Sequence, residues 1–284
     1  MINPVGDIMN TNKKFNKLKK ILAGMESVLV AYSGGVDSTL LLKVAKNTLK
    51  DRVLAVIAKS PTYPSGEVRN AEGTAGRLGV KHRIITTHEF SKPEFRSNPV
   101  NRCYHCKKEL FLKLKEIARK ERIKFVIDGS NYDDGKDFRP GNRAKAEFRV
   151  RSPLEEAGFT KGDIRTLSKK LKLPTWNKPS LACLASRFPY GLPLRRTELN
   201  RVNKAEEFLR GLGFKQVRVR HYGDTVRIEA DKNKLSCIAH SASFIVKKLK
   251  KLGYTYITLD LEGYRSGSMN EAIKTQIAKV KAQS

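Results

Sequence analysis

One stretch strongly restricts the possible folds of this chain: residues 28–45, which read VLVAYSGGVDSTLLLKVA. Its first five residues form a continuous apolar run, as expected for a strand that is covered on both faces of a parallel sheet. Two glycines then interrupt the run, and a helix is expected from about Asp37 to Leu49. The stretch therefore predicts a buried strand that leads through a glycine turn into a helix.

The rest of the first half repeats this alternation. Apolar runs at 53–58, 82–88 and 125–129 are expected to be further strands, and helical patterns at 65–80 and 104–121 lie between them. Strands that alternate with helices imply a doubly wound parallel sheet. The predicted fold class of this half is therefore α/β.

The pattern changes from about Gly191 onward. Residues 216–230 alternate apolar and basic residues around Gly223 and Asp224, which is typical of a β-hairpin. We expect this hairpin to lie in a smaller α+β domain with helices at 201–214 and 232–251 and a strand at 254–261. The sequence thus predicts two domains, residues 1–190 and residues 191–284.

The composition of the chain indicates which partners and which cellular location to expect. The 284 residues include 57 Lys and Arg against 28 Asp and Glu, for a net charge of +29. Such a surface attracts polyanions such as RNA or anionic nucleotides, although a general surface bias of the source proteome explains it equally well. The sequence has neither a long apolar run nor the apolar core of a signal peptide, so we expect a cytoplasmic protein without a membrane partner.

The turn after the first strand has the chemistry of an anion site. Gly34 and Gly35 allow backbone N–H groups to approach a ligand closely, and the start of the next helix adds partial positive charge. The hydroxyls of Ser33 and Ser38 can donate to phosphate oxygens. Asp37 would repel a bare phosphate, so we expect it to hold Mg²⁺ beside one. The pattern differs from the Walker P-loop, which requires a lysine after a longer loop.

The four cysteines are too few for a secreted disulfide framework. Cys103 and Cys106 form a C-x-x-C pair at the expected start of a helix, a position that favours the thiolate form. Cys237 lies in a helical segment of the second half. We expect Cys237 to be a core residue and not a metal ligand.

A third cysteine, Cys183, suggests a metal site together with this pair. Three cysteines can bind three irons of a [4Fe-4S] cluster and leave one iron open. Zinc is an alternative, with His105 or His221 as a fourth ligand. A dithiol redox pair and unliganded thiols are further alternatives, because spacing alone does not identify the metal.

The string SGGVDS resembles the PP-loop of the ATP pyrophosphatase (N-type) superfamily, whose fold is HUP-like. Those enzymes cleave ATP between its α- and β-phosphates and transfer AMP to a carbonyl or carboxyl oxygen. The resemblance implies that Ser33, Gly34, Gly35, Asp37 and Ser38 bind ATP and Mg²⁺. It also implies that Ala58 and Ser60 line the adenine site and that Gly129 approaches the nucleotide.

Three further strings resemble the LarE family of this superfamily. They are DFRPGNRAKAEFRVRSPL at 137–154, CLASRFPYG at 183–191 and TLDLEGYRSGSMN at 258–270. The resemblance covers nearly the whole chain. It implies an ATP-dependent sulfur transferase of nickel-pincer nucleotide cofactor biosynthesis, whose small-molecule substrate is pyridinium-3,5-biscarboxylate mononucleotide. One carboxylate would be adenylated, and sulfur would then displace AMP.

The LarE resemblance also implies a set of residues for the substrate phosphate, which a guanidinium fork matches well. The set comprises Ser186, Arg187, Glu206, Arg218, Arg220 and Arg265. Solvated faces of a strand and a helix are the alternative interpretation for Arg218, Arg220 and Glu206. Arg187 and Arg265 lie beside turn residues, where a functional role is more common.

The chain departs from LarE members that sacrifice a cysteine sulfur. Their cysteine falls one position before Cys183, where this chain has Ala182, and they lack the C-x-x-C pair. The three cysteines instead resemble those of cluster-bearing relatives, which implies catalytic sulfur transfer with Cys103, Cys106 and Cys183 holding [4Fe-4S]. The sulfur would come from hydrosulfide or another donor, and relatives suggest a homo-oligomer.

Three alternative functions remain open. A cluster-dependent tRNA thiolase of the same superfamily would use the three cysteines and the basic surface, although no RNA-binding module is recognisable in the sequence. A nucleotide sensor would bind ATP without cleaving it. An amidotransferase would use ammonia and would have no need of the cysteines.

Overall fold

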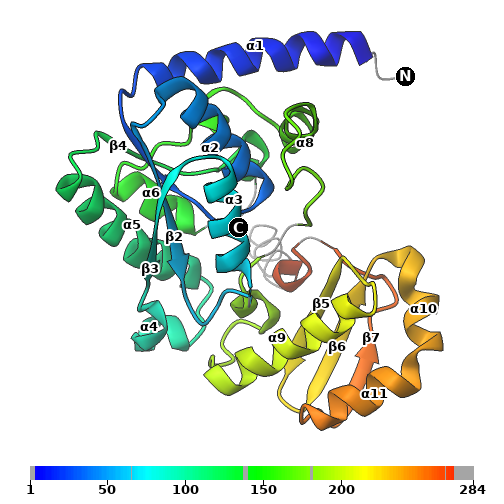
Figure 1. Cartoon of the computed structure of the whole chain (residues 1–284). Coiled ribbons are helices and arrows are strands. Elements are labelled where there is room, and N and C mark those ends of the chain that lie inside the picture. Colours follow the sequence, from blue (N-terminus) through cyan, green and yellow to red (C-terminus); the bar gives the residue numbers. More distant parts are fainter. Residues whose placement is uncertain (1–3, 65, 137–139, 180–181, 266, 272–284) are drawn as a thin grey trace, which may run out of the picture. The chain divides into compact units, whose positions relative to one another are not determined.

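A computed structural model describes residues 4–271, except residues 65, 137–139, 180–181 and 266. The chain divides into two compact units (Figure 1). Unit 1 comprises Met1–Ser60, Ser65–Phe95 and Val100–Leu181, and unit 2 comprises Pro61–Pro64, Arg96–Pro99 and Ala182–Ser284. The predicted division into domains of residues 1–190 and 191–284 stays a prediction.

Unit 1 is built on a four-stranded parallel sheet. Its strands are β1 (Val28–Ala31), β2 (Val53–Lys59), β3 (Lys81–Thr86) and β4 (Phe125–Ile127). Their order is β3-β2-β1-β4, so the chain adds strands on one side of β1 and then returns to its other side. The predicted parallel sheet is confirmed, and its order reverses between β1 and β4.

Helices cover both faces of this sheet (Figure 1). Val28 and Val30 of β1 belong to a core with residues of α1, α2, α3, α7 and α8, whereas Leu29 belongs to a second core with α5 and α6. Neighbouring residues of a strand point to opposite faces, which explains why the whole run is apolar. The helices are α1 (Pro4–Ala23), α2 (Val36–Leu49), α3 (Glu67–Arg77), α4 (Pro93–Arg96), α5 (Arg102–Lys120), α6 (Gly141–Glu147), α7 (Pro153–Glu156) and α8 (Lys161–Lys170).

Unit 2 contains a three-stranded sheet in the order β5-β6-β7. Strands β5 (Val217–Tyr222) and β6 (Thr225–Ala230) form the predicted hairpin, and β7 (Tyr256–Leu259) pairs with β6 in parallel. Its helices are α9 (Arg196–Gly211), α10 (Leu235–His240) and α11 (Ala242–Lys251). Short 3-10 helices are η1 (Glu89–Ser91) and η2 (Tyr132–Lys136) in unit 1, and η3 (Leu184–Arg187), η4 (Lys232–Lys234) and η5 (Ser268–Asn270) in unit 2.

Two predictions for unit 2 were wrong. The single helix expected over 232–251 is interrupted at Ser241, which separates α10 from α11. Cys237 is exposed on α10 and is not the core residue that we expected. The short α10 buries only Ile238, so the other side chains of this helix are left at the surface. In the part of the chain that the structure describes, no helix combines the length and apolar character needed to cross a bilayer.

The start of α8 is fixed by a partly buried carboxylate, that of Asp163. Asp163 and Thr160 form a capping box, in which the Thr160 backbone N–H donates to Asp163 Oδ2 at 2.9 Å. Thr11 Oγ1 and Lys14 Nζ of α1 also donate to this carboxylate, at 2.8 and 2.6 Å. Burial alone would raise the pKa of Asp163, but these hydrogen bonds outweigh it and lower the pKa to about 2. Asp163 therefore ties α8 to α1 in its ionised form.

We predict that Asp163→Asn lowers the free energy of unfolding of unit 1 by about 1–2 kcal/mol at pH 7. Since the folded-state pKa is depressed, this stabilisation is present above about pH 3.8 and is lost as the pH falls toward 2. Urea unfolding at pH 7 and pH 2.5 should show the gap between the two proteins closing. Asp51→Asn, at an exposed carboxylate paired with Lys46, should have little effect at either pH. An equal gap at both pH values would contradict this assignment.

Candidate functional site

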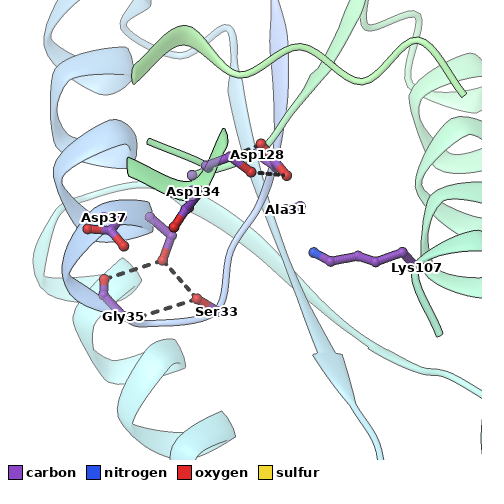
Figure 2. Close-up of a pocket in the computed structure, with 10 residues that line it drawn as sticks. Ala31, Ser33, Gly35, Asp37, Lys107, Asp128 and Asp134 are labelled. Atoms are coloured by element: carbon purple, nitrogen blue, oxygen red, sulfur yellow. Dashed lines mark hydrogen bonds between the residues drawn. The ribbon is translucent and has the colours of Figure 1, made fainter. Parts of the chain in front are cut away.

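The loop between β1 and α2 is held by its own hydroxyl groups (Figure 2). Ser33 Oγ lies 3.1 Å from Ser38 Oγ and accepts a hydrogen bond from the Gly35 backbone N–H at 3.4 Å. The Ser38 hydroxyl also donates to the Gly35 carbonyl at 3.3 Å. These bonds orient both serines toward the start of α2, where the helix dipole favours an anion.

Two glycines are required by close packing around this loop. Gly34 has a φ of +70°, and a Cβ there would lie 2.8 Å from the Cβ of Ala71 on α3. Gly129 follows β4, and a Cβ there would lie 2.9 Å from the backbone N of Ser38. The chain after β4 therefore touches the first turn of α2 directly, and the approach of Gly129 to a nucleotide stays a prediction.

A pocket of about 230 Å³ opens between the carboxyl ends of β1 and β4 (Figure 2). This is the point where the strand order reverses, and ligands of open α/β sheets bind at such points. It brings together four of the predicted loop residues with Gly129. Its lining comprises Ala31, Ser33, Gly35, Asp37, Ser38, Lys107, Asp128, Gly129, Ser130 and Asp134.

Sequence reasoning missed several residues of this pocket. Asp128 lies directly after β4, and its carboxylate accepts hydrogen bonds from the Ser130 hydroxyl at 2.9 Å and the Ser152 hydroxyl at 2.7 Å. Its place at the carboxyl end of a strand was the signal that could have identified it. Lys107 comes from α5 and Asp134 from η2, and no local pattern marks either of them.

A second pocket, of about 170 Å³, shares Ser33, Gly35 and Asp37 with the first. Its other lining residues are Val36, Glu67, Lys161, Arg165, Lys178 and Pro179. The Lys161 ammonium contacts the Asp37 carboxylate, at 2.6 Å from Oδ1. Lys178 Nζ lies 2.7 Å from Glu67 Oε2 and 3.1 Å from the Gly34 carbonyl. The loop therefore separates two pockets, and cations line the second one.

Three of the predicted ATP-binding residues, Gly34, Ala58 and Ser60, fall outside both linings. Ala58 is partly buried near the end of β2, and Ser60 follows that strand. The Ser60 hydroxyl is hydrogen-bonded to the buried carboxylate of Glu89. An adenine site at these residues stays a prediction.

The cysteines are distributed over both units. Cys103 and Cys106 lie three residues apart near the start of α5, on the same side of the helix, and both are partly exposed. Cys183 belongs to unit 2, where its carbonyl accepts hydrogen bonds from the Ser186 hydroxyl at 2.8 Å and from Arg187 Nη1 at 3.0 Å. Among the described residues, no group of three or more Cys, His, Asp or Glu side chains is arranged to hold a metal ion.

The thiol pair on α5 fits part of an iron–sulfur donor set, since thiolates are the ligands of such clusters. That Cys183 joins this pair stays a prediction. For the zinc alternative, His221 is buried at 1% exposure, with its Nδ1 3.2 Å from the Tyr254 hydroxyl. Burial, helped by Arg201, lowers the pKa of His221 to about 4. His105 lies on α5 between the two cysteines, edge-on to Tyr104.

Unit 2 contains a buried network of arginines and glutamates. Arg187 Nε and Nη2 donate to the two carboxylate oxygens of Glu206 at 2.8 and 3.0 Å, and both side chains are fully buried. Arg220 Nη2 donates to Glu229 at 2.6 Å and Nη1 donates to the Ser186 carbonyl at 2.9 Å. The network thus joins η3, α9 and the hairpin.

The alternative of solvated faces is wrong for three of these residues: Glu206, Arg218 and Arg220 are 0%, 2% and 5% exposed. Burial and the nearby Arg187 lower the pKa of Arg218 to about 10. The part that Arg187 contributes is repulsion between like charges, and an anion beside both guanidinium groups would relieve it. Arg265 differs, because it is partly exposed and pairs with Asp260, Glu262 and Glu271.

The doubly wound sheet, the glycine–serine loop and the pocket at the switch point define a nucleotide-binding protein of the PP-loop class. Comparison with known proteins agrees, since residues 8–125 match the NAD synthase family. A pyridinium-3,5-bisthiocarboxylic acid mononucleotide synthase of Lactiplantibacillus plantarum is 39% identical over 90% of this chain and 94% of its own length. The chain belongs to the family of this synthase, the LarE family.

Two uncharacterised proteins show the same full-length similarity. One, from Synechocystis, is 41% identical over 92% of this chain and 98% of its own length. The other, from Methanocaldococcus jannaschii, is 34% identical over 89% of this chain and 98% of its own length. The similarity therefore includes unit 2 and is not confined to the nucleotide-binding unit.

We predict that Gly129→Ala weakens ATP binding by about tenfold or more, a change of about 1.4 kcal/mol, because the added Cβ displaces the first turn of α2. Isothermal titration with Mg·ATP measures the effect, and circular dichroism checks that the fold is kept. Gly76→Ala is the matched control, since a Cβ at that position of α3 meets nothing within 4 Å. Equal ATP affinity of Gly129→Ala and wild type would show that this approach does not shape the site.

Proposed function

We propose that this protein is an ATP-dependent sulfur transferase that acts on pyridinium-3,5-biscarboxylate mononucleotide in nickel-pincer nucleotide cofactor biosynthesis. ATP adenylates one carboxylate of the substrate, and sulfur then displaces AMP to leave a thiocarboxylate. The observation that carries the proposal is the 39% identity to the bisthiocarboxylic acid mononucleotide synthase across both units. The geometry of each unit supports it.

Unit 1 supplies the groups that an adenylation requires. A carboxylate is a poor electrophile, and attachment of AMP gives it a good leaving group. Ser33, Ser38 and the start of α2 bind phosphate oxygens, and Asp37 holds Mg²⁺ beside them. In this proposal Lys161 and Lys178, which line the second pocket, stabilise the departing pyrophosphate.

Unit 2 supplies a binding site for the phosphate of the substrate. Arg187, Arg218 and Arg220 are all buried, and two of them pair with fully buried carboxylates: Arg187 with Glu206 and Arg220 with Glu229. Arg220 Nε is buried without a hydrogen-bond partner among the residues that the structure describes. An anion beside Arg220 would supply an acceptor for this atom and would interact favourably with the buried guanidinium groups. Ser186 and Arg265 complete the proposed set.

The cysteines supply the sulfur chemistry in this proposal. Bound through Cys103, Cys106 and Cys183, a [4Fe-4S] cluster would supply sulfide, because three protein ligands leave one of its four irons open. The chain's own contribution at Cys183 is a fixed backbone, held by Ser186 and Arg187. The sulfur donor is hydrosulfide or another small sulfur compound. Cytoplasmic location and a homo-oligomer stay predictions.

We predict that anaerobically reconstituted wild-type protein contains iron and acid-labile sulfide and forms more than one thiocarboxylate per chain when sulfide is added. Cys103→Ser should contain much less iron and much less acid-labile sulfide, because a hydroxyl is a poor ligand for the iron of such a cluster. Cys237→Ser should behave as wild type, since its thiol is exposed on α10. Iron analysis, visible spectroscopy and mass spectrometry of the product provide the measurements.

Other outcomes of this experiment separate the alternatives. A colourless protein that turns over once and loses one cysteine sulfur would indicate sacrificial transfer. Zinc in place of iron would indicate the alternative metal. Thiolation of tRNA with no reaction of the mononucleotide would overturn the proposed substrate.

We predict that Arg218→Gln raises the KM for the mononucleotide by about tenfold or more and leaves the KM for ATP unchanged. Loss of one charge-assisted hydrogen bond costs about 1.5–3 kcal/mol. Arg218→Lys, which keeps the charge but not the fork, should have an intermediate effect. Lys204→Gln, at an exposed position of α9, is the control. Steady-state kinetics with each substrate varied in turn measures the change, and an equal rise in both KM values would contradict a specific phosphate site.

A further inference from the structure

Lys107 is the one cation among the described residues that line the pocket at the switch point, and neither the loop motif nor the proposed phosphate site includes it. Figure 2 shows its side chain reaching into the pocket from α5, opposite the loop that carries Ser33 and Asp37. The other charged lining residues are the carboxylates of Asp37, Asp128 and Asp134. The single ammonium group thus faces the nucleotide loop across the pocket.

The stem of Lys107 is positioned by packing. A Cβ on Gly141, the first residue of α6, would lie 3.1 Å from Lys107 Cγ, so the backbone of α6 approaches this stem closely. The Nζ atom lies 5.3 Å from the centre of the ring of Phe111, which is fully buried one turn further along α5. These two contacts direct the ammonium group along a defined path into the pocket.

Lys107 forms no ion pair within the described part of the chain, whereas its neighbour Lys108 does. Lys108 Nζ lies 3.8 Å from Glu147 Oε1 and 5.7 Å from the centre of the Tyr104 ring. The other lysines near the loop are also engaged, Lys161 by Asp37 and Lys178 by Glu67. Lys107 is therefore a cation inside the pocket whose charge is not already compensated by an ion pair.

We propose that Lys107 is a catalytic residue that binds the acceptor carboxylate and brings it to the α-phosphate of ATP. This inference rests on the proposed function. Both reactants are anions, so they repel each other unless a cation lies between them. Lys161 and Lys178 line the second pocket and are assigned to the leaving pyrophosphate, whereas Lys107 lines the first pocket and is assigned to the acceptor.

The step is a simple displacement. One oxygen of the acceptor carboxylate attacks the α-phosphorus, and the bond between the α-phosphorus and the bridging oxygen of the β-phosphate breaks. Pyrophosphate leaves with that electron pair, and the acyl adenylate remains. Lys107 keeps its proton throughout and stabilises the negative charge that the acceptor oxygen shares with the α-phosphate oxygens. No oxidant or further reactant is required.

The decisive experiment measures pyrophosphate release from Mg·ATP when pyridinium-3,5-biscarboxylate mononucleotide is added without a sulfur donor. Removal of a preorganised charge of this kind lowers the rate by about 10²–10³-fold. We expect Lys107→Gln to lower kcat/KM for the acceptor by about that factor, with ATP affinity within about threefold of wild type. Lys107→Arg, which keeps the charge, should recover part of the loss.

Lys108→Gln is the matched control, because it makes the same chemical change one residue away and should leave the rate unchanged. An active wild type together with an equally active Lys107→Gln would overturn this role and leave the proposed function intact. A loss of ATP affinity that matches the loss of rate would also overturn it, since Lys107 would then serve the nucleotide. If wild type releases no pyrophosphate with this acceptor, both the proposed function and the role of Lys107 are overturned.

Discussion

The architecture of the nucleotide pocket depends on one close approach, that of Gly129 to the first turn of α2. A Cβ added to Gly129 would lie 2.9 Å from the Ser38 nitrogen, which is too close. The chain after β4 can therefore pass there because glycine has no side chain. This contact places the end of β4 beside the end of β1, where the strand order reverses. The helix dipole, the two serine hydroxyls and Asp128 then face the same space. Steric exclusion at a single backbone position therefore defines the crevice.

The ion pairs of the two units differ in how deeply they are buried. Around the loop, each lysine of the second pocket contacts a carboxylate at a partly exposed position, so these charges remain hydrated and cost little to maintain. In unit 2 five residues of the arginine–glutamate network, Arg187, Arg218, Arg220, Glu206 and Glu229, are almost completely buried. Buried ion pairs of this kind often contribute little net stability, because desolvation opposes their attraction. Stability alone therefore does not account for this network, whereas the proposed recognition of an anionic ligand does.

The sequence predicted what local patterns determine, and it missed what the tertiary fold brings together. The apolar run at β1, the alternation of strands and helices, the hairpin and the serine–glycine loop follow from periodicity and turn chemistry, and the structure confirms them. Lys107, Lys161 and Lys178 come from segments remote from the loop, and lysines are common in this chain, so no pattern distinguished them. The break at Ser241 and the exposure of Cys237 were missed because helical periodicity does not reveal where a helix is interrupted.

The contact between Asp37 and Lys161 bears on how this pocket can hold both a metal ion and a phosphate. An ionised carboxylate offers about four lone-pair positions, so Asp37 can accept from Lys161 and still coordinate Mg²⁺. Lys161 reduces the repulsion between Asp37 and an incoming phosphate, and the metal ion would reduce it further. Under the proposed function, a carboxylate that would otherwise repel ATP thus becomes part of its binding site. With the loop, Asp37 and Lys161 already in place, the groups proposed to surround the leaving pyrophosphate are organised before any nucleotide arrives, and the proposed reaction requires little reorganisation of them.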